Sequence, residues 1–211
     1  MKPAEQAQPK KNAAFSICKR ICVSKAHTAI FSGLTGCGKS HRILDLLENE
    51  YKGHFEFIII LCQTIRCNKT YLARSWIKED DRVFLVESGG KLLEWLKLLS
   101  AFFVDDMIAD ETLDKTRGAL LDIAISGRHR EHSLWMLTQR YKKFPITVRD
   151  QLKQLLVWFP KNRHELELII TENDVGSWDV GYIKERLKNQ KHACLYLRLE
   201  HPRTFQVLTN I

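Results

Sequence analysis

The segment from residue 33 to residue 40 constrains the fold of this chain more than any other. It fits the pattern G-x-x-x-x-G-K-[ST] at every defined position, and this pattern forms a loop whose backbone N–H groups surround phosphates. The apolar residues 27–32 before it predict a strand, and the leucine spacing after it predicts a helix from Lys39 to about Tyr51. With a strand on one side and a helix on the other, the segment predicts a nucleoside triphosphate site rather than an ordinary turn. The predicted binding residues are Gly33, Leu34, Thr35, Gly36, Cys37, Gly38, Lys39 and Ser40.

Each defined residue of this segment has a physical role in holding phosphate. The glycines let N–H groups turn inward, and the N-terminus of the following helix favours negative charge. Lys39 is expected to reach the β- and γ-phosphates as a catalytic cation, and the Ser40 hydroxyl is expected to bind Mg²⁺. Cys37 stands at an undefined position, where a simple filler role and a redox role both stay open, because a helix N-terminus lowers a thiol pKa.

A second candidate element is the segment 101–106, in which four apolar residues precede Asp105 and Asp106. Taken alone, such an ending is usually a turn or a helix cap. On the next strongly apolar strand after a phosphate loop, it predicts an acidic site whose tip lies beside that loop. Asp105 is then expected to hold Mg²⁺, and Asp106 to orient the attacking water. The second carboxylate favours an ATPase over a GTPase, and the nearest match to the GTPase motif N-K-x-D, at residues 68–71, lacks the Asp.

A third candidate element is the segment 133–139, an apolar run that ends in Thr138 and Gln139. Ligands of parallel sheets lie beyond the carboxyl ends of the strands, so Gln139 is expected to face the γ-phosphate and to position water or sense hydrolysis. Arg128 lies just upstream, in the segment Gly-Arg-His-Arg. Two roles are open for it: a charge that stabilises a helix C-terminus, or an arginine that acts on a bound nucleotide.

Strand-like and helix-like segments alternate along the rest of the chain, which predicts an α/β fold with a central, mostly parallel sheet flanked by helices. Residues 26–211 are expected to form one domain, and residues 1–25, with six Lys/Arg and one Glu, a basic flexible arm. The closing runs predict a β-hairpin across His201-Pro202. Further strands are expected at 55–63, 83–86, 101–104, 133–137, 155–159, 193–199 and 204–208, and further helices at 91–99, 113–125, 163–173 and 178–189.

The distribution of charge points to a nucleic-acid partner. The formal net charge is +8, and residues 140–163 hold seven Lys/Arg and one Asp with Tyr141, Phe144 and Trp158 between them. This stretch predicts contact with the phosphate backbone of DNA. The longest apolar run, at 57–62, is too short for a membrane span. The six cysteines form no C-x-x-C pair, which favours free thiols in a reducing compartment.

The segments GLTGCGKS, FFVDDM and GRHREHSLWMLTQR-YKKFPITVRDQ together resemble the FtsK/HerA superfamily. Within it, the sequence is similar to the poxvirus-type genome-packaging ATPases of Polinton/Maverick elements, adintoviruses and virophages. The resemblance covers residues 27–171 or so, and its most specific part is G-R-H-x-x-x-S followed by the apolar run and Thr-Gln. It implies a P-loop NTPase with the additional-strand, RecA/FtsK-like order.

The resemblance also implies a function and a set of site residues. The implied cofactors are ATP and Mg²⁺, and the implied assembly is a homo-oligomeric ring, often a hexamer, that pumps double-stranded DNA into a preformed capsid. A capsid or portal-vertex protein is the implied partner, and the host nucleus, a cytoplasmic virus factory or the virion the implied location. ATP binding maps to Gly33–Ser40, Mg²⁺ binding to Asp105, water activation to Asp106, the sensor to Thr138 and Gln139, and an arginine acting on a neighbouring subunit to Arg128.

Three other functions are compatible with a phosphate loop in a chain of this length. A helicase would share the mechanism and would be recognised by strand separation. A nucleoside or nucleotide kinase would leave the Thr-Gln strand and the basic stretch 140–163 without a purpose. An ATP-gated module that binds DNA or a capsid without hydrolysis would fit if Asp106 positions water poorly, and it would show no steady turnover under saturating ATP.

Overall fold

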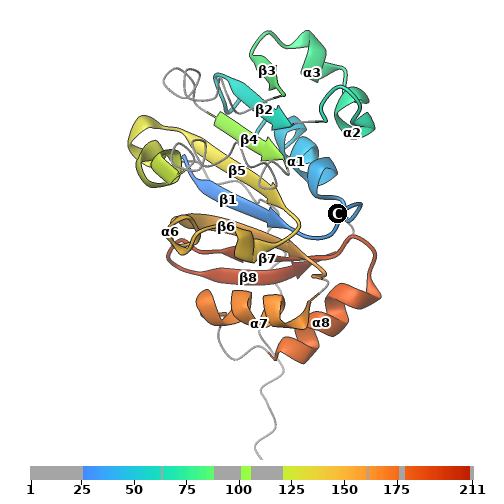
Figure 1. Ribbon diagram of the computed structural model, residues 1–211, viewed down its shortest axis with the longest axis vertical. Helices are drawn as coiled ribbons and strands as arrows, with labels where there is room; N and C mark the ends of the chain where they lie inside the picture. Colours follow the sequence, from blue (N-terminus) through green and yellow to red (C-terminus); the bar gives the residue numbers. More distant parts are fainter. Residues whose placement is uncertain are drawn as a thin grey trace, which may run out of the picture.

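The computed structural model describes residues 26–62, 64–87, 101–105, 121–160, 162–175 and 179–209. Eight strands form a single sheet in the order β3-β2-β4-β5-β1-β6-β7-β8, which Figure 1 shows from top to bottom. In that order the strands are β3 (Val83–Val86), β2 (Ile58–Cys62), β4 (Ala101–Asp105), β5 (Ser133–Thr138), β1 (Thr28–Ser32), β6 (Leu152–Trp158), β7 (Cys194–Arg198) and β8 (Thr204–Leu208).

The sheet is parallel from β3 to β6, and β7 and β8 are antiparallel to their neighbours. Strand β1 lies between β5 and β6, and all five of its residues are buried, as expected for an apolar strand that is covered on both faces. Strand β5 stands between β1 and β4, which confirms the additional-strand order. The antiparallel pairing of β7 with β8 likewise confirms the hairpin predicted across His201-Pro202, a peptide bond that is cis.

The strand order corrects one expectation about the acidic segment. Because β5 separates β4 from β1, the end of β4 does not lie directly beside the strand that carries the phosphate loop. The register still aligns the three strand ends, since Ser32 pairs with Thr138 and Leu137 pairs with Asp105. The carboxyl ends of β1, β5 and β4 therefore form one row along the same edge of the sheet.

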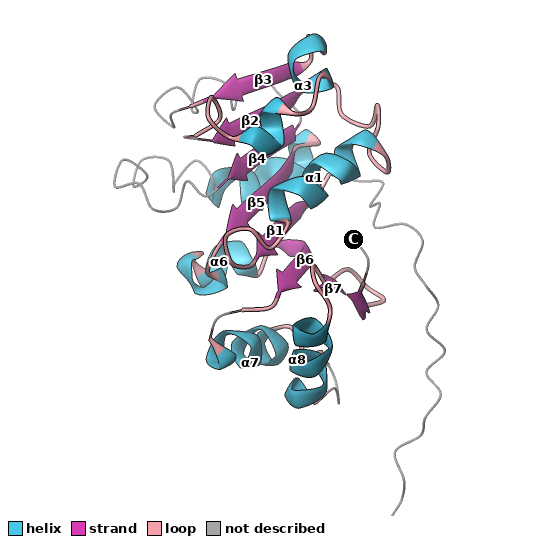
Figure 2. Cartoon of the chain, turned by 90° about the vertical axis from the view of Figure 1, so that its right-hand side faces the viewer, coloured by secondary structure: helices cyan, strands magenta, loops and turns pink. Residues whose placement is uncertain are grey.

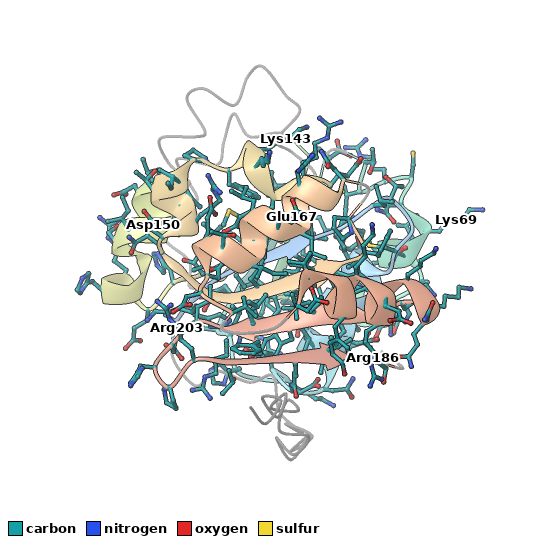
Figure 3. The ribbon with its side chains drawn as sticks, turned by 90° about the horizontal axis from the view of Figure 1, so that it is seen from below. Lys69, Lys143, Asp150, Glu167, Arg186 and Arg203 are labelled. Carbon is teal, nitrogen blue, oxygen red and sulfur yellow. The ribbon has the colours of Figure 1, made fainter. Side chains whose placement is uncertain are left out.

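Alternation of side chains along the strands divides the core into two layers. On one face, Ala29 and Phe31 of β1 pack in a cluster with the leucines of α1 (Lys39–Glu48). On the other face, Ile30 belongs to a cluster that includes apolar side chains of α7 (Arg163–Glu172) and α8 (Val180–Asn189). Figure 2 shows α1 lying across the strands, with α7 and α8 at the β6–β7 end, and Figure 3 looks onto these two helices with Glu167 and Arg186 labelled.

Short helices join the larger elements, and the sequence did not predict them. They are α2 (Lys69–Leu72), α3 (Trp76–Glu79), α6 (Ile146–Arg149) and the 3₁₀ helices η3 (Gly127–Arg130) and η4 (Tyr141–Lys143). Each has three or four residues, too few to show a helical period.

Several expectations fall partly or wholly outside the described residues. The helix expected at 113–125 is present where the structure describes it, at 121–126, whereas the helix expected at 91–99 and the arm 1–25 lie outside the described ranges. Within those ranges, no helix is long and apolar enough to cross a membrane. Cys37, Cys62, Cys67 and Cys194 are free thiols there.

Candidate active site

The phosphate loop connects the carboxyl end of β1 to the first turn of α1. Gly36 and Gly38 have φ angles of +76° and +109°, a left-handed conformation that glycine adopts without strain. The N–H of Gly33 donates to the carbonyl of Thr138 at 3.0 Å, so the start of the loop is tied to the end of β5. The backbone of the loop is therefore bent in the way that lets its N–H groups point into the loop, at the N-terminus of α1.

Close packing adds a second reason for glycine at position 33. A Cβ on Gly33 would lie 2.7 Å from Cβ of Trp158 and 2.8 Å from Sγ of Cys37. Both distances are too short for any side chain larger than hydrogen. Trp158 is the last residue of β6, so that strand sets one wall of the loop.

Lys39 is the first residue of α1, and its ammonium lies inside the loop. Nζ donates to the carbonyls of Gly33 at 2.7 Å and Leu34 at 2.9 Å, and the residue is 8% exposed. The positive charge is thus enclosed by the backbone that is predicted to surround the phosphates. This is the position that a cation needs in order to reach a phosphate held by the same loop.

The structure argues against a redox role for Cys37. Burial raises the pKa of its thiol, and the Lys39 ammonium, 3.9 Å from Sγ, only partly opposes that effect. A raised pKa keeps the thiol protonated, and the thiolate is the reactive form. The lowering expected from the helix N-terminus is outweighed by desolvation.

Ser40 and Asp105 are candidates for a magnesium site. Ser40 is the second residue of α1, and Asp105 is the last residue of β4, two strands along the same edge of the sheet. Mg²⁺ is commonly held by one or two protein ligands together with phosphate oxygens and water. The described residues contain no group of three or more His, Cys, Asp or Glu that could hold a metal by themselves. Ser40 and Asp105 have the residue types that such a shared site needs, a hydroxyl and a carboxylate. Asp106 lies outside the described residues.

Thr138 ends β5 next to the phosphate loop, and Gln139 follows it. The Thr138 hydroxyl bonds to both backbone groups of Arg140, accepting from the N–H and donating to the carbonyl, each at 3.0 Å. These bonds close a turn that leaves Gln139 exposed at the tip of the strand. Since the Thr138 carbonyl also holds the N–H of Gly33, Gln139 follows directly after a residue in contact with the loop. Thr138 therefore fixes the turn, and Gln139 is the exposed residue of that turn.

Arg128 is placed far from the phosphate loop of its own chain. Its backbone lies in η3, which precedes the start of β5, at the edge of the sheet opposite the strand tips. Arg130, two residues on, lies 3.7 Å from the Asp122 carboxylate in an exposed pair. The structure thus does not bring Arg128 together with Lys39, Ser40 and Gln139.

Only part of the basic stretch 140–163 presents free cations on the surface. Arg140, Lys142 and Lys143 are exposed at η4, immediately after Gln139. Arg149 instead forms an ion pair with Glu172 and lies over the ring of Tyr141 at 5.1 Å. Lys153 lies 3.5 Å from the Glu200 carboxylate.

Three aromatic residues that the sequence placed among these cations are buried rather than exposed. Tyr141, Phe144 and Trp158 are at most 5% exposed, so they belong to the core and offer no stacking surface to DNA. Burial raises the pKa of Tyr141 to about 12, which keeps its hydroxyl neutral. Among the side chains of this stretch that the structure describes, the exposed basic ones are therefore those around η4.

Sequence reasoning missed His192, which lies in the turn before β7. Its Nδ1 is 3.0 Å from the carbonyl of Cys37, a contact between residues 155 positions apart. It also lines a hollow of about 330 Å³ beside the loop. The only local signal is the polar run before β7, which does not indicate a distant partner. The residues that line this hollow are Gly38, His41, Arg42, Asp45, Trp158 and His192.

The sequence matches no protein-family model and no curated protein sequence. Similar folds are found among solved structures. The genome packaging NTPase B204 of Sulfolobus turreted icosahedral virus 2, in complex with AMP, is 15% identical with a TM-score of 0.62 over 88% of this chain and 98% of that chain. The DNA-packaging ATPase B204 of Sulfolobus turreted icosahedral virus is 15% identical with a TM-score of 0.63 over 90% of this chain and 100% of that chain.

A bacterial protein shares the same architecture. EssC (ATPases 2 and 3) from Geobacillus thermodenitrificans is 15% identical with a TM-score of 0.61, over 87% of this chain and 39% of that chain. At these identities the likeness concerns the fold, and it agrees with the strand order and loop described above. The fold expected from the FtsK/HerA resemblance is therefore confirmed, and the chain has the P-loop NTPase fold that B204 and EssC share.

Proposed function

We propose that this chain is an ATPase that moves double-stranded DNA into a viral or transposon capsid. The observation that carries the proposal is a complete phosphate loop with Lys39 enclosed in it, next to an additional strand that presents Gln139. The B204 structures, which include complexes with AMPPCP and ATP-gammaS, match nearly their full length to this chain. Their described role in genome packaging supports the same role here.

Each residue at the carboxyl edge of the sheet has a proposed part in hydrolysis. Lys39 stabilises charge on the transferring phosphate, and Ser40 and Asp105 hold Mg²⁺, which neutralises phosphate charge when bound. Asp106 orients the attacking water, and Gln139 detects the γ-phosphate. Lys39 and Ser40 are held by the first turn of α1 before any reaction, so little reorganisation of these two residues is needed in the transition state.

Arg128 is proposed to act on the nucleotide of a neighbouring subunit in a ring. Its place at the edge of the sheet opposite the phosphate loop supports an outward reach rather than a role in its own chain. Mixing Arg128→Ala protein with Lys39→Ala protein would pair an intact loop with an intact arginine, and activity is expected to return. If the mixture assembles and stays inactive, Arg128 is a structural charge near a helix end.

DNA contact is proposed for the exposed cations at η4 and for the basic arm of residues 1–25. The packaging proposal also includes a capsid or portal-vertex partner, and a host nucleus or cytoplasmic virus factory as the place of action. The proposal keeps residues 26–211 as one ATPase domain, preceded by the basic arm of residues 1–25.

The decisive experiment measures ATP hydrolysis by the purified chain with and without double-stranded DNA. DNA-stimulated phosphate release, with no phosphoryl transfer to nucleosides, is the expected result. Transfer of phosphate to a nucleoside would identify a kinase instead, and DNA-stimulated strand separation would identify a helicase. Binding of ATP without turnover would identify a nucleotide-gated binding module.

A further inference from the structure

The hollow beside the phosphate loop lies on the side of β1 away from the proposed hydrolysis site. Asp105 ends β4 and Gln139 follows β5, and both strands lie on one side of β1, whereas Trp158 ends β6 on the other side. A triphosphate whose γ-phosphate faces Gln139 therefore extends its nucleoside toward β6 and β7. That is where the hollow opens, along the first turns of α1.

His192 ties this hollow to the phosphate loop. Its φ angle is +64°, and its Nδ1 lies 3.0 Å from the carbonyl oxygen of Cys37. A carbonyl only accepts hydrogen bonds, so Nδ1 carries the proton and donates. In a neutral imidazole this leaves Nε2 as an acceptor, and the ring itself packs close to Gly38, whose added Cβ would lie 3.3 Å from Nδ1.

The bond to Cys37 also orients a donor toward the phosphates. The carbonyl of Cys37 and the N–H of Gly38 belong to the same planar trans peptide, so they point in opposite directions. Because His192 holds the carbonyl outward, the N–H of Gly38 is turned toward the inside of the loop. His192 therefore fixes the direction of one of the N–H groups that the phosphate-binding pattern requires.

The walls of the hollow suit a nucleobase and its ribose. Trp158 is almost fully buried, and its indole nitrogen would lie 3.9 Å from a Cβ on Gly38, so the indole reaches the loop. The His192 ring forms another wall, and His41, Arg42 and Asp45 add polar groups from α1. A volume of about 330 Å³ is within the range of small-molecule sites. The half-exposed His192 ring can stack on the face of any base, because every base has a π-face, while the buried Trp158 only closes the hollow.

We propose that His192 is a positioning residue that joins two parts of one nucleotide site. Its Nδ1–H orients the Cys37–Gly38 peptide toward the phosphates, and its half-exposed ring, in a hollow closed by the buried Trp158, forms a subsite for the base and ribose of a nucleoside triphosphate. This inference rests on the proposed function and adds the nucleoside half of the site, which the phosphate-loop pattern does not include.

The test compares ATP with inorganic tripolyphosphate, each with Mg²⁺, by titration calorimetry on the full chain. Tripolyphosphate reports on the loop alone, and ATP reports on the loop and the subsite together. The wild-type chain is expected to bind ATP more tightly than tripolyphosphate. His192→Asn keeps a side-chain donor for the Cys37 carbonyl and tolerates the left-handed backbone, but it removes the ring. It should weaken ATP binding by about 5-fold or more and leave tripolyphosphate binding unchanged.

A glycine at the same position separates the two roles of His192. His192→Gly tolerates the backbone angle and removes the donor, so it should weaken both ligands. His164→Asn, an exposed histidine on α7, is the matched control and should change neither affinity. Thermal melting of every variant identifies any loss of the fold.

Two results would overturn the proposal while leaving the phosphate site intact. One is equal affinity of the wild-type chain for ATP and tripolyphosphate, which would show that the nucleoside gains nothing from the hollow. The other is a His192→Asn variant that weakens both ligands equally or neither of them. If the wild-type chain binds neither ligand, the proposed ATPase function itself is wrong, and the subsite assignment is wrong with it.

Discussion

The two sides of β1 offer different chemistry to a ligand at its carboxyl end. Toward β5 lie the exposed Gln139 and the turn that the Thr138 hydroxyl closes, and the end of β4 lies one strand further along the same edge of the sheet. Toward β6 and β7 lie aromatic walls that hold the loop by packing and by the hydrogen bond from His192. The first side suits charge and water, and the second suits a flat, weakly polar group. This difference indicates a direction for the bound nucleotide, with chemistry on one side and recognition on the other.

The largest effect on activity is expected at Lys39, which lies in the phosphate loop between these two sides. Replacing Lys39 with Ala removes the enclosed cation, and the rate of ATP hydrolysis is expected to fall by about 10²-fold or more. Phosphate release measures the effect, and circular dichroism verifies the fold. Lys69→Ala is the matched control, because Lys69 begins α2 and points into solvent in Figure 3. Near wild-type hydrolysis by Lys39→Ala would contradict the site assignment.

The next largest effect is expected after β4, where a substitution of Asp106 should separate ATP binding from ATP hydrolysis. Asp106→Asn keeps the side-chain shape but removes the charge that orients water, so hydrolysis should fall by roughly 10²-fold while ATP stays bound. Filter binding with labelled ATP, alongside turnover, gives both quantities. A variant that no longer binds ATP would assign Asp106 to metal binding or to structure.

The different outcomes for the phosphate loop and the basic stretch have a physical explanation. The loop depends on local backbone geometry at Gly36 and Gly38, so the residue pattern carries nearly all the information. The strands were predictable for a similar reason, because fully buried strands are continuous apolar runs. In both cases, the pattern of neighbouring residues is enough to predict the local structure.

Burial and pairing in the basic stretch depend on residues distant in sequence. Arg149 is neutralised by Glu172 from α7, and Tyr141 is covered by the same layer, which no local pattern reveals. His192 escaped notice because its partner lies 155 residues away. The additional strand between β1 and β4 was expected from the family resemblance and not from periodicity.

A smaller effect is expected at the turn that presents Gln139. Thr138→Val keeps the shape of the side chain but leaves the two backbone groups of Arg140 without the hydroxyl. The free energy of unfolding should fall by about 1–2 kcal/mol, which lowers Tm by roughly 2–8 °C in a chain of this size. Hydrolysis should fall as well, because Gln139 loses its fixed position. Thr138→Ser, which keeps the hydroxyl, should restore both; if it behaves like Val, packing and not the turn explains the result.

The smallest expected effect concerns DNA binding. It tests whether the exposed and the ion-paired cations of the stretch 140–163 contribute differently to DNA affinity. Lys142 and Lys143 are exposed beside Gln139, whereas Arg149 is paired with Glu172. Each phosphate contact contributes roughly 0.9 to the slope of log affinity against log salt, so Lys142→Glu with Lys143→Glu should flatten that slope by about 2. Arg149→Gln should lower Tm and leave the slope unchanged, because its charge is already used within the fold. Fluorescence anisotropy with a duplex of arbitrary sequence, at several salt concentrations, measures the slope for each variant.

An unchanged slope in the double variant would show that η4 faces solvent or another protein, and DNA contact would then have to come from the arm of residues 1–25.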